Sequence, residues 1–129
     1  MFDGVSEIES AHVGTGELVS WRVAHAALQG IARRRAALEV EEARWLVVAK
    51  RVGVHVELGF ASFLEYMDRM LGYRRRVAFE RLRVAERLEA LPETTELLEA
   101  GAISYSAVRE ITRVAEPETE RAWLDAIEI

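Results

Sequence analysis

Apolar residues recur at helical spacing through almost the whole chain, and this feature constrains the fold most. Only two prolines interrupt 129 residues. One segment, 52–60, instead alternates apolar and other residues with period two, as a strand does. The sequence offers it no partner strand, and a lone strand leaves its backbone groups unpaired, so we expect an extended connector there. The pattern as a whole predicts an all-α fold.

The longest predicted helix covers residues 17–52, with Thr15 as its N-cap. Its apolar residues follow a nearly heptad spacing, interrupted by Arg35 and Glu42 where a coiled coil favours apolar side chains. The interpretation we prefer is a core helix with a mixed stripe; the alternative is a homodimer seam containing a charged pair. The stripe consists of Trp21, Ala24, Leu28, Ile31, Leu38, Trp45, Ala49 and Val52. We expect the three tryptophans, Trp21, Trp45 and Trp123, to be core or interface anchors.

Shorter helices are predicted after the connector. Ser62 and Glu65 form a capping box for a helix that Gly72 ends, and a second helix follows over 74–91 before Pro92. Three more helices are expected over 93–100, over 104–115 with Ser104 as cap, and from Pro117 onwards. We therefore predict an N-terminal segment, 1–16, and one helical domain, 17–129, in which the long helix packs on a bundle of short ones. Residues 62–91 have the outline of a helix-turn-helix. No stop signal precedes Ile129, so we expect a chain truncated before a further domain.

The net charge of −5 hides a basic block. Residues 69–87 hold seven arginines against Glu80 and Glu86, and the rest of the chain is strongly acidic. At 100° per residue, Arg76, Arg83 and Arg87 fall on one narrow stripe of the second helix, and Arg74 and Arg75 stand at its start. Arginine bonds phosphate oxygens and guanine edges in bidentate fashion, so these five residues are the candidate DNA contacts. Arg81 projects onto the apolar side, where we expect a structural ion pair.

The same stripe is open to a plainer interpretation. Arg76, Glu80 and Arg83 have the spacing of intrahelical ion pairs, which are common on solvated helices. The turn is also atypical, with Asp68 four residues before Gly72 and Arg74 in place of a Ser or Thr cap. A protein-interaction module, pairing through helix 17–52 and using the arginines only for solubility, fits the acidic remainder of the chain better.

A family resemblance favours DNA. The stretch LGFASFLEYMDRMLGYRRRVAFERLRVAERLEALPETTELLEAG, continuing to residue 126, resembles the helical region beside HNH endonuclease domains in myxobacterial and actinobacterial proteins. Residues 71–111 are also similar to the helix-turn-helix of ParB-type partition proteins. Both resemblances imply double-stranded DNA as partner, with Arg74, Arg75 and Arg76 at the start of the recognition helix and Arg83 further along it.

The chain itself lacks a recognisable catalytic site. It has no Cys and no Asn, and its three histidines (His12, His25 and His55) are scattered, whereas an HNH nuclease needs a metal-binding set of such residues. No phosphate-binding glycine loop is present and no serine has a neighbouring base. We therefore expect no enzymatic activity, cofactor, metal or small-molecule substrate. No apolar run is long enough for a membrane span and no signal peptide is evident, so a cytoplasmic location is expected.

These observations favour a DNA-binding or DNA-positioning module of an HNH-type protein, without its catalytic domain. The alternative is a helical dimerisation or protein-interaction module with no nucleic-acid role.

Overall fold

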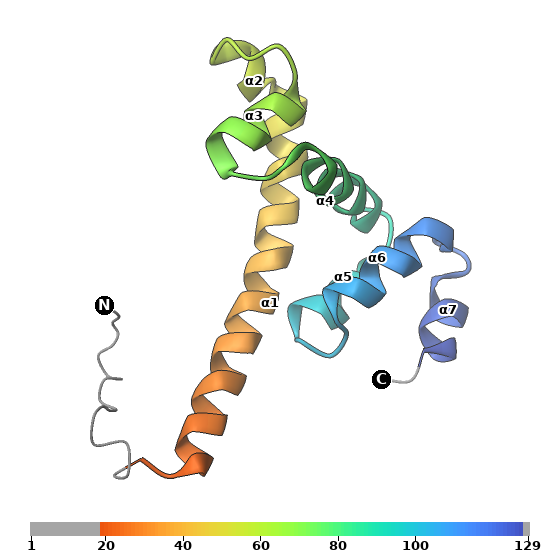
Figure 1. Ribbon diagram of the computed structural model, residues 1–129. Coiled ribbons are helices and arrows are strands. Elements are labelled where there is room, and N and C mark those ends of the chain that lie inside the picture. The colour runs from red at the N-terminus through yellow and green to blue at the C-terminus, as the bar shows by residue number, and fades with distance from the viewer. Residues whose placement is uncertain (1–18, 128–129) are drawn as a thin grey trace. The chain divides into compact units, whose positions relative to one another are not determined.

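The computed structural model describes residues 19–127, and every regular element in that range is an α-helix (Figure 1). The all-α prediction is confirmed. The chain divides into two compact units, residues 1–34 and 35–129. The helices are α1 (Trp21–Val52), α2 (Val54–Glu57), α3 (Phe63–Leu71), α4 (Arg75–Leu88), α5 (Pro92–Glu99), α6 (Tyr105–Val114) and α7 (Glu120–Ala126).

Helix α1 begins at Trp21, four residues later than predicted. The side chain and carbonyl of Ser20 accept the backbone N–H of Val23, at 3.3 and 3.1 Å, so Ser20 provides the cap. The predicted cap Thr15 and the segment 1–16 lie outside the described residues. Within unit 35–129, α1 packs on the shorter helices as predicted.

The expected extended connector is wrong. After α1 ends, Gly53 takes a left-handed conformation (φ 79°) and the chain forms the four-residue helix α2. The Phe60 N–H then donates to the His55 carbonyl at 2.8 Å, which closes the turn. With no neighbouring strand in the described part of the chain, local helical bonds satisfy these backbone groups. The period-two pattern reflects a tight turn here.

Helices α3 and α4 form the predicted pair around Gly72. Ser62 caps α3 by accepting the Glu65 N–H at 3.1 Å, and the Glu65 side chain returns to the N–H of Ala61 at 2.7 Å. Gly72 ends α3 at φ 79°, as the sequence predicts. Helix α4 stops at Leu88 because Pro92 opens α5 as its first residue.

The last two helices differ in how well their starts were predicted. Ser104 caps α6 by accepting the Ala107 N–H at 3.1 Å, as expected. Pro117 does not open α7: residues 117–119 form a turn, in which the Thr119 hydroxyl accepts the Glu116 N–H at 2.9 Å, and the helix begins at Glu120.

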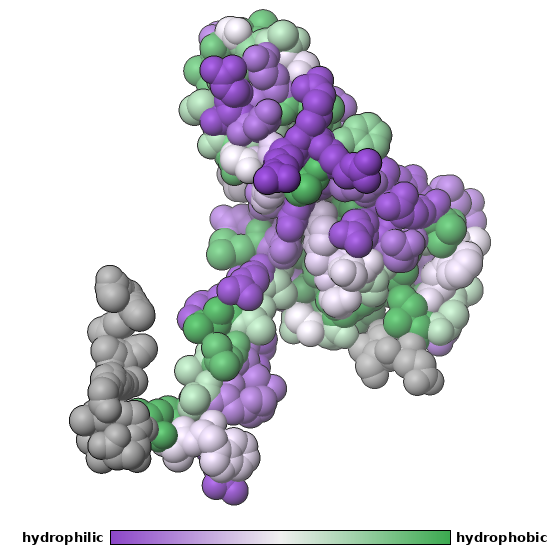
Figure 2. Space-filling model, viewed as in Figure 1, coloured by the Kyte–Doolittle hydropathy of each residue, from purple (hydrophilic) through white to green (hydrophobic). Residues whose placement is uncertain are grey.

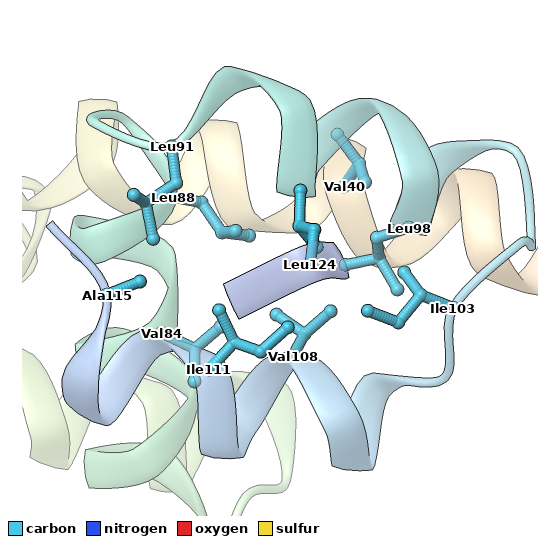
Figure 3. Close-up of a cluster of buried hydrophobic side chains, with 10 residues drawn as sticks. All are labelled: Val40, Val84, Leu88, Leu91, Leu98, Ile103, Val108, Ile111, Ala115 and Leu124. Atoms are coloured by element: carbon cyan, nitrogen blue, oxygen red, sulfur yellow. The ribbon is translucent and has the colours of Figure 1, made fainter. Parts of the chain in front are cut away.

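The core of unit 35–129 consists of two apolar clusters that share α1. In the first, side chains from α1, α4, α5, α6 and α7 converge (Figure 3); its buried members are Val40, Val84, Leu88, Leu91, Leu98, Ile103, Val108, Ile111, Ala115 and Leu124. The second joins α1 to α3 and α4 through Leu46, Val47, Phe63, Met67, Ala78, Leu82 and Ala85. Burial of this many large side chains is the main stabilising contribution to the unit. Val77 of α4 takes no part in either cluster and is exposed.

Over residues 19–127, no helix has the length and apolarity that crossing a membrane requires.

Candidate functional site

Three of the five candidate DNA contacts are exposed at the start of α4. Arg74 is the N-cap residue, and Arg75 and Arg76 open the helix. None of the three has an ion-pair partner among residues 19–127, and the first turn of α4 contains no acidic residue. The helix N-terminus adds its own partial positive charge. The local electrostatics therefore favour an anion.

The other two candidates are half-buried and bonded to neighbouring groups of the unit, so the predicted row of solvent-facing arginines is wrong. Arg83 donates to Glu80 at 3.1 Å, to the Thr112 hydroxyl at 3.3 Å and to the Arg109 carbonyl at 3.1 Å. Its side chain is only 22% exposed. The later part of the stripe of α4 that the sequence places in solvent faces α6 instead, whereas Arg76 at its start is exposed.

Arg87 joins the same helix pair at its other end. Its guanidinium donates to the Ala115 carbonyl and lies 3.5 Å from a Glu116 carboxylate oxygen. The Arg83 hydrogen bond lowers the pKa of Glu80, an effect that Arg113, 3.4 Å away on α6, reinforces. Arg83 and Arg87 thus satisfy acceptors at the α4–α6 contact.

Arg81 forms the structural ion pair that its position predicts. It bonds Glu39 on α1, lies 3.6 Å from Glu42, and stacks over the Tyr105 ring at 4.3 Å. The Tyr73 hydroxyl donates to both Glu42 carboxylate oxygens, at 2.7 and 2.9 Å. Burial and this hydrogen bond raise the pKa of Tyr73 to about 12. Glu42 is therefore fixed by two groups from outside α1.

A hollow of about 480 Å³ opens beside this network. Its apolar wall comes from Leu38 and Trp45. Its charged wall holds three carboxylates against two guanidiniums: Glu39, Glu41, Glu42, Arg35 and Arg81, with Tyr73 at the edge. Since Glu39 is bonded to Arg81 and Glu41 has no ion-pair partner in the described range, the hollow presents excess negative charge.

Most of the apolar heptad stripe of α1 is exposed, so the preferred interpretation of it as a core stripe is wrong; Ala49 alone among its residues in 35–52 packs on the second apolar cluster. Within 35–52, Leu38, Trp45 and Val52 are 60%, 64% and 67% exposed. Within 21–34, the same repeat leaves Trp21, Leu28 and Ile31 exposed. Figure 2 shows apolar side chains at the surface of the N-terminal part of α1.

A second apolar face of α1, which the sequence reasoning missed, makes the core contacts. Val40 enters one cluster, Leu46 and Val47 enter the other, and Ala43 contacts both. The signal was present: residues 40, 43 and 47 have the i, i+3, i+7 spacing of a buried helix face. The more regular heptad stripe concealed it. Helix α1 therefore carries two apolar faces, and residues 19–127 cover one of them while leaving most of the heptad stripe exposed.

Comparison with known protein families, curated proteins and solved structures finds no match. Residues 19–127 also contain no group of three or more His, Asp or Glu side chains placed to hold a metal ion.

Proposed function

We propose that the chain is a self-association module in which α1 pairs with α1 of a second copy through the heptad stripe. The observation that carries this proposal is the outward direction of that stripe in a helix whose core contacts come from another face. A large apolar stripe rimmed by charge is typical of a protein–protein contact. Within 35–52 its exposed apolar residues are Leu38, Trp45 and Val52, whereas Ala49 packs on the core.

The repeat itself favours a second copy over an unrelated partner. In a two-helix coiled coil, stripe residues recur on average every 3.5 residues, which keeps the stripes of the two helices in contact along their length. A second copy of α1 supplies a stripe with this same spacing. Residues 20–29 are all exposed, and an isolated helical segment is marginally stable in water. Pairing would bury Trp21, Leu28 and Ile31 and stabilise this segment.

The test is the mass of the full chain in solution, by analytical ultracentrifugation over a range of concentrations. We expect a dimer, and we expect Leu38→Lys/Trp45→Lys to raise its Kd by at least about a hundredfold, since interface tryptophans are frequent hot spots. Leu58→Lys/Trp123→Lys is the matched control, because both residues are exposed and lie off the stripe. A monomeric native chain, or equal effects of the two double variants, would exclude the proposal.

Double-stranded DNA is the second candidate partner, and the free arginines at the start of α4 favour it. Three exposed guanidiniums and a helix N-terminus suit a phosphate backbone. The resemblance to the helical region beside HNH nuclease domains makes duplex DNA the polymer to test. Such a role would concern Arg74, Arg75 and Arg76, since Arg83 and Arg87 are engaged within the unit.

The DNA test compares two sets of variants in a gel shift with duplex DNA. Replacing Arg74, Arg75 and Arg76 with Ala should abolish binding and leave the unfolding midpoint unchanged. About three phosphate contacts imply a slope near −3 for log K against log salt. Unchanged binding in the triple variant would remove DNA from consideration at this surface.

A further inference from the structure

We propose that the two α1 helices pair antiparallel, with Arg35 of each copy seated beside the acidic hollow of the other. This inference rests on the proposed self-association and specifies its geometry. It depends on the two charged residues that interrupt the stripe. Arg35 and Glu42 are seven residues apart and occupy the same heptad position.

Parallel pairing would place like charges together. In a parallel, in-register coiled coil each residue of the stripe faces its own counterpart. Arg35 would face Arg35 of the second copy, and one heptad later Glu42 would face Glu42. Two layers of repulsion, separated only by the Leu38 layer, would therefore occur in the middle of the seam, where charges are least screened.

Antiparallel pairing places opposite charges together. The stripe occupies two positions of each heptad. In an antiparallel pair a residue at one of these positions packs beside a residue at the other position on the second helix, so Arg35 packs in a layer with either Leu38 or Trp45 of the second copy. In both registers the Glu42 carboxylate of that copy lies within about one helical turn, or 5.4 Å along the axis. By two-fold symmetry the contact occurs twice, and each interrupting residue becomes an ion-pair partner for the other.

The hollow is suited to an incoming guanidinium. Glu42 is fixed at its wall by the Tyr73 hydroxyl at 2.7 Å and by Arg81 at 3.6 Å. The apolar wall includes Trp45, whose 64% exposed ring can stack on an arginine. Arg35 itself has no ion pair among the described residues. The surplus carboxylate on one copy thus matches the unpaired guanidinium on the other.

The residues beside the stripe repeat the charge order of Arg35 and Glu42, with an arginine first and a glutamate seven residues later. Arg34 and Glu41 each precede a stripe residue by one position, and neither has an ion-pair partner within 19–127. In the antiparallel register that layers Arg35 with Leu38, these flanking positions bring Arg34 of one copy opposite Glu41 of the other. In a parallel pair Arg34 would instead face Glu39, whose carboxylate is bonded to Arg81 within its own subunit.

Distances between identical labels on the two copies test the orientation. The chain has no cysteine, so Arg51→Cys and Arg44→Cys, both at exposed residues off the stripe, each provide one spin-label site in the full chain. For antiparallel helices the rise of 1.5 Å per residue separates labels at residue 51 by about 33–44 Å, and labels at residue 44 by about 25 Å or less. For parallel helices, whose axes lie 8–10 Å apart, both separations would be about 20 Å or less.

Each outcome is informative. A long distance at 51 with a shorter one at 44 supports antiparallel pairing. Short distances at both sites overturn the orientation while self-association stands. Absence of any intermolecular distance, with a monomer in the ultracentrifuge, overturns both. Replacing Arg51 removes only its exposed ion pair with Glu89, so the label site leaves the fold intact.

A charge reversal gives a second, independent test. Arg35→Glu places a carboxylate beside Glu42 of the second copy in an antiparallel pair, so we expect its Kd to rise about tenfold or more. A mixture of this variant with the native chain should then show intermediate affinity. In a parallel pair the mixture would bind more tightly than either protein alone, because the carboxylate introduced on one helix would face the native Arg35 on the other.

Discussion

The carboxylate of Glu120 caps helix α5 from 26 residues away, accepting both the Thr94 N–H at 2.6 Å and the Thr94 hydroxyl at 2.8 Å. Both residues are buried. Helix α5 has no side-chain cap of its own from Leu91, so this carboxylate satisfies an amide of its first turn. The same bonds join the first residue of α7 to α5.

Removing that carboxylate should destabilise the chain strongly. Glu120→Ala leaves a buried amide and hydroxyl without an acceptor, and we expect a loss of about 2–3 kcal/mol in the free energy of unfolding. Urea denaturation followed by circular dichroism measures it. Glu118→Ala, at an exposed turn position, is the control and should be neutral. Equal stability of the two variants would contradict the capping role.

Arg83 should stabilise the fold, which a purely solvent-exposed arginine would not do. Arg83→Ala removes the hydrogen bonds that join α4 to α6, and we expect a loss of about 1–2 kcal/mol. Arg76→Ala, on the exposed start of the same helix, should be neutral. Thermal unfolding of both variants distinguishes this arrangement from an exposed arginine row, in which neither change would alter the midpoint.

The same contact has a pH signature. The Arg83 hydrogen bond lowers the pKa of Glu80 in the folded chain below its ordinary value of 4.5. The unfolded chain therefore binds the proton more readily, so the contribution of Glu80 to stability is present above pH 4.5 and is lost as the pH falls through the folded pKa. In Arg83→Ala this acid-dependent loss should shrink. Urea unfolding at several pH values between 3 and 7 measures it.

Tyr73 should give the opposite dependence at alkaline pH. Its pKa is raised from 10.0 to about 12, chiefly by burial and then by its bond to Glu42. The folded state holds this proton more tightly than the unfolded state, so the stabilisation is complete below pH 10 and declines as the pH rises to about 12. We expect the stability advantage of the native chain over Tyr73→Phe to decline across that interval. A constant difference from pH 8 to 12 would contradict it.

Two glycines should respond to the same substitution with opposite signs. Gly72 has φ 79° with open space around it, so Gly72→Ala costs only backbone strain, about 1 kcal/mol of unfolding free energy. Gly30 lies inside α1 and its nearest neighbour is the end of the Arg34 side chain at 3.6 Å. Gly30→Ala should therefore stabilise the helix by roughly 0.5–1 kcal/mol. Urea unfolding measures the first and amide hydrogen exchange within 21–34 the second.

The helices themselves could be predicted largely from local chemistry. Ser62, Ser104 and Gly72 act where the sequence places them, because a cap depends on residues within one turn of it. Helix α2 could not be predicted from local chemistry in this way, because alternating apolar residues also suit a tight turn when no second strand is near. Pro117 was misplaced for a related reason: a proline suits a turn as well as a helix start.

The candidate site was less predictable, because helical periodicity tells which side chains share a face but not what covers that face. Arg76, Arg83 and Arg87 do share one side of α4. Their different exposure arises from α6, which meets the later part of the stripe and supplies acceptors to Arg83 and Arg87. In α1 the regular heptad suggested the core, whereas the less regular set around Val40 and Val47 is the buried one.

The placement of Val40 and Trp45 on different faces of α1 separates two properties that many small helical proteins combine. Changes around the buried Val40 act on the stability of the fold, whereas changes around the exposed Trp45 would act on the proposed pairing of α1 and leave the fold intact. Substitutions on the exposed face alone could therefore change the binding partner during evolution while each intermediate sequence still folds.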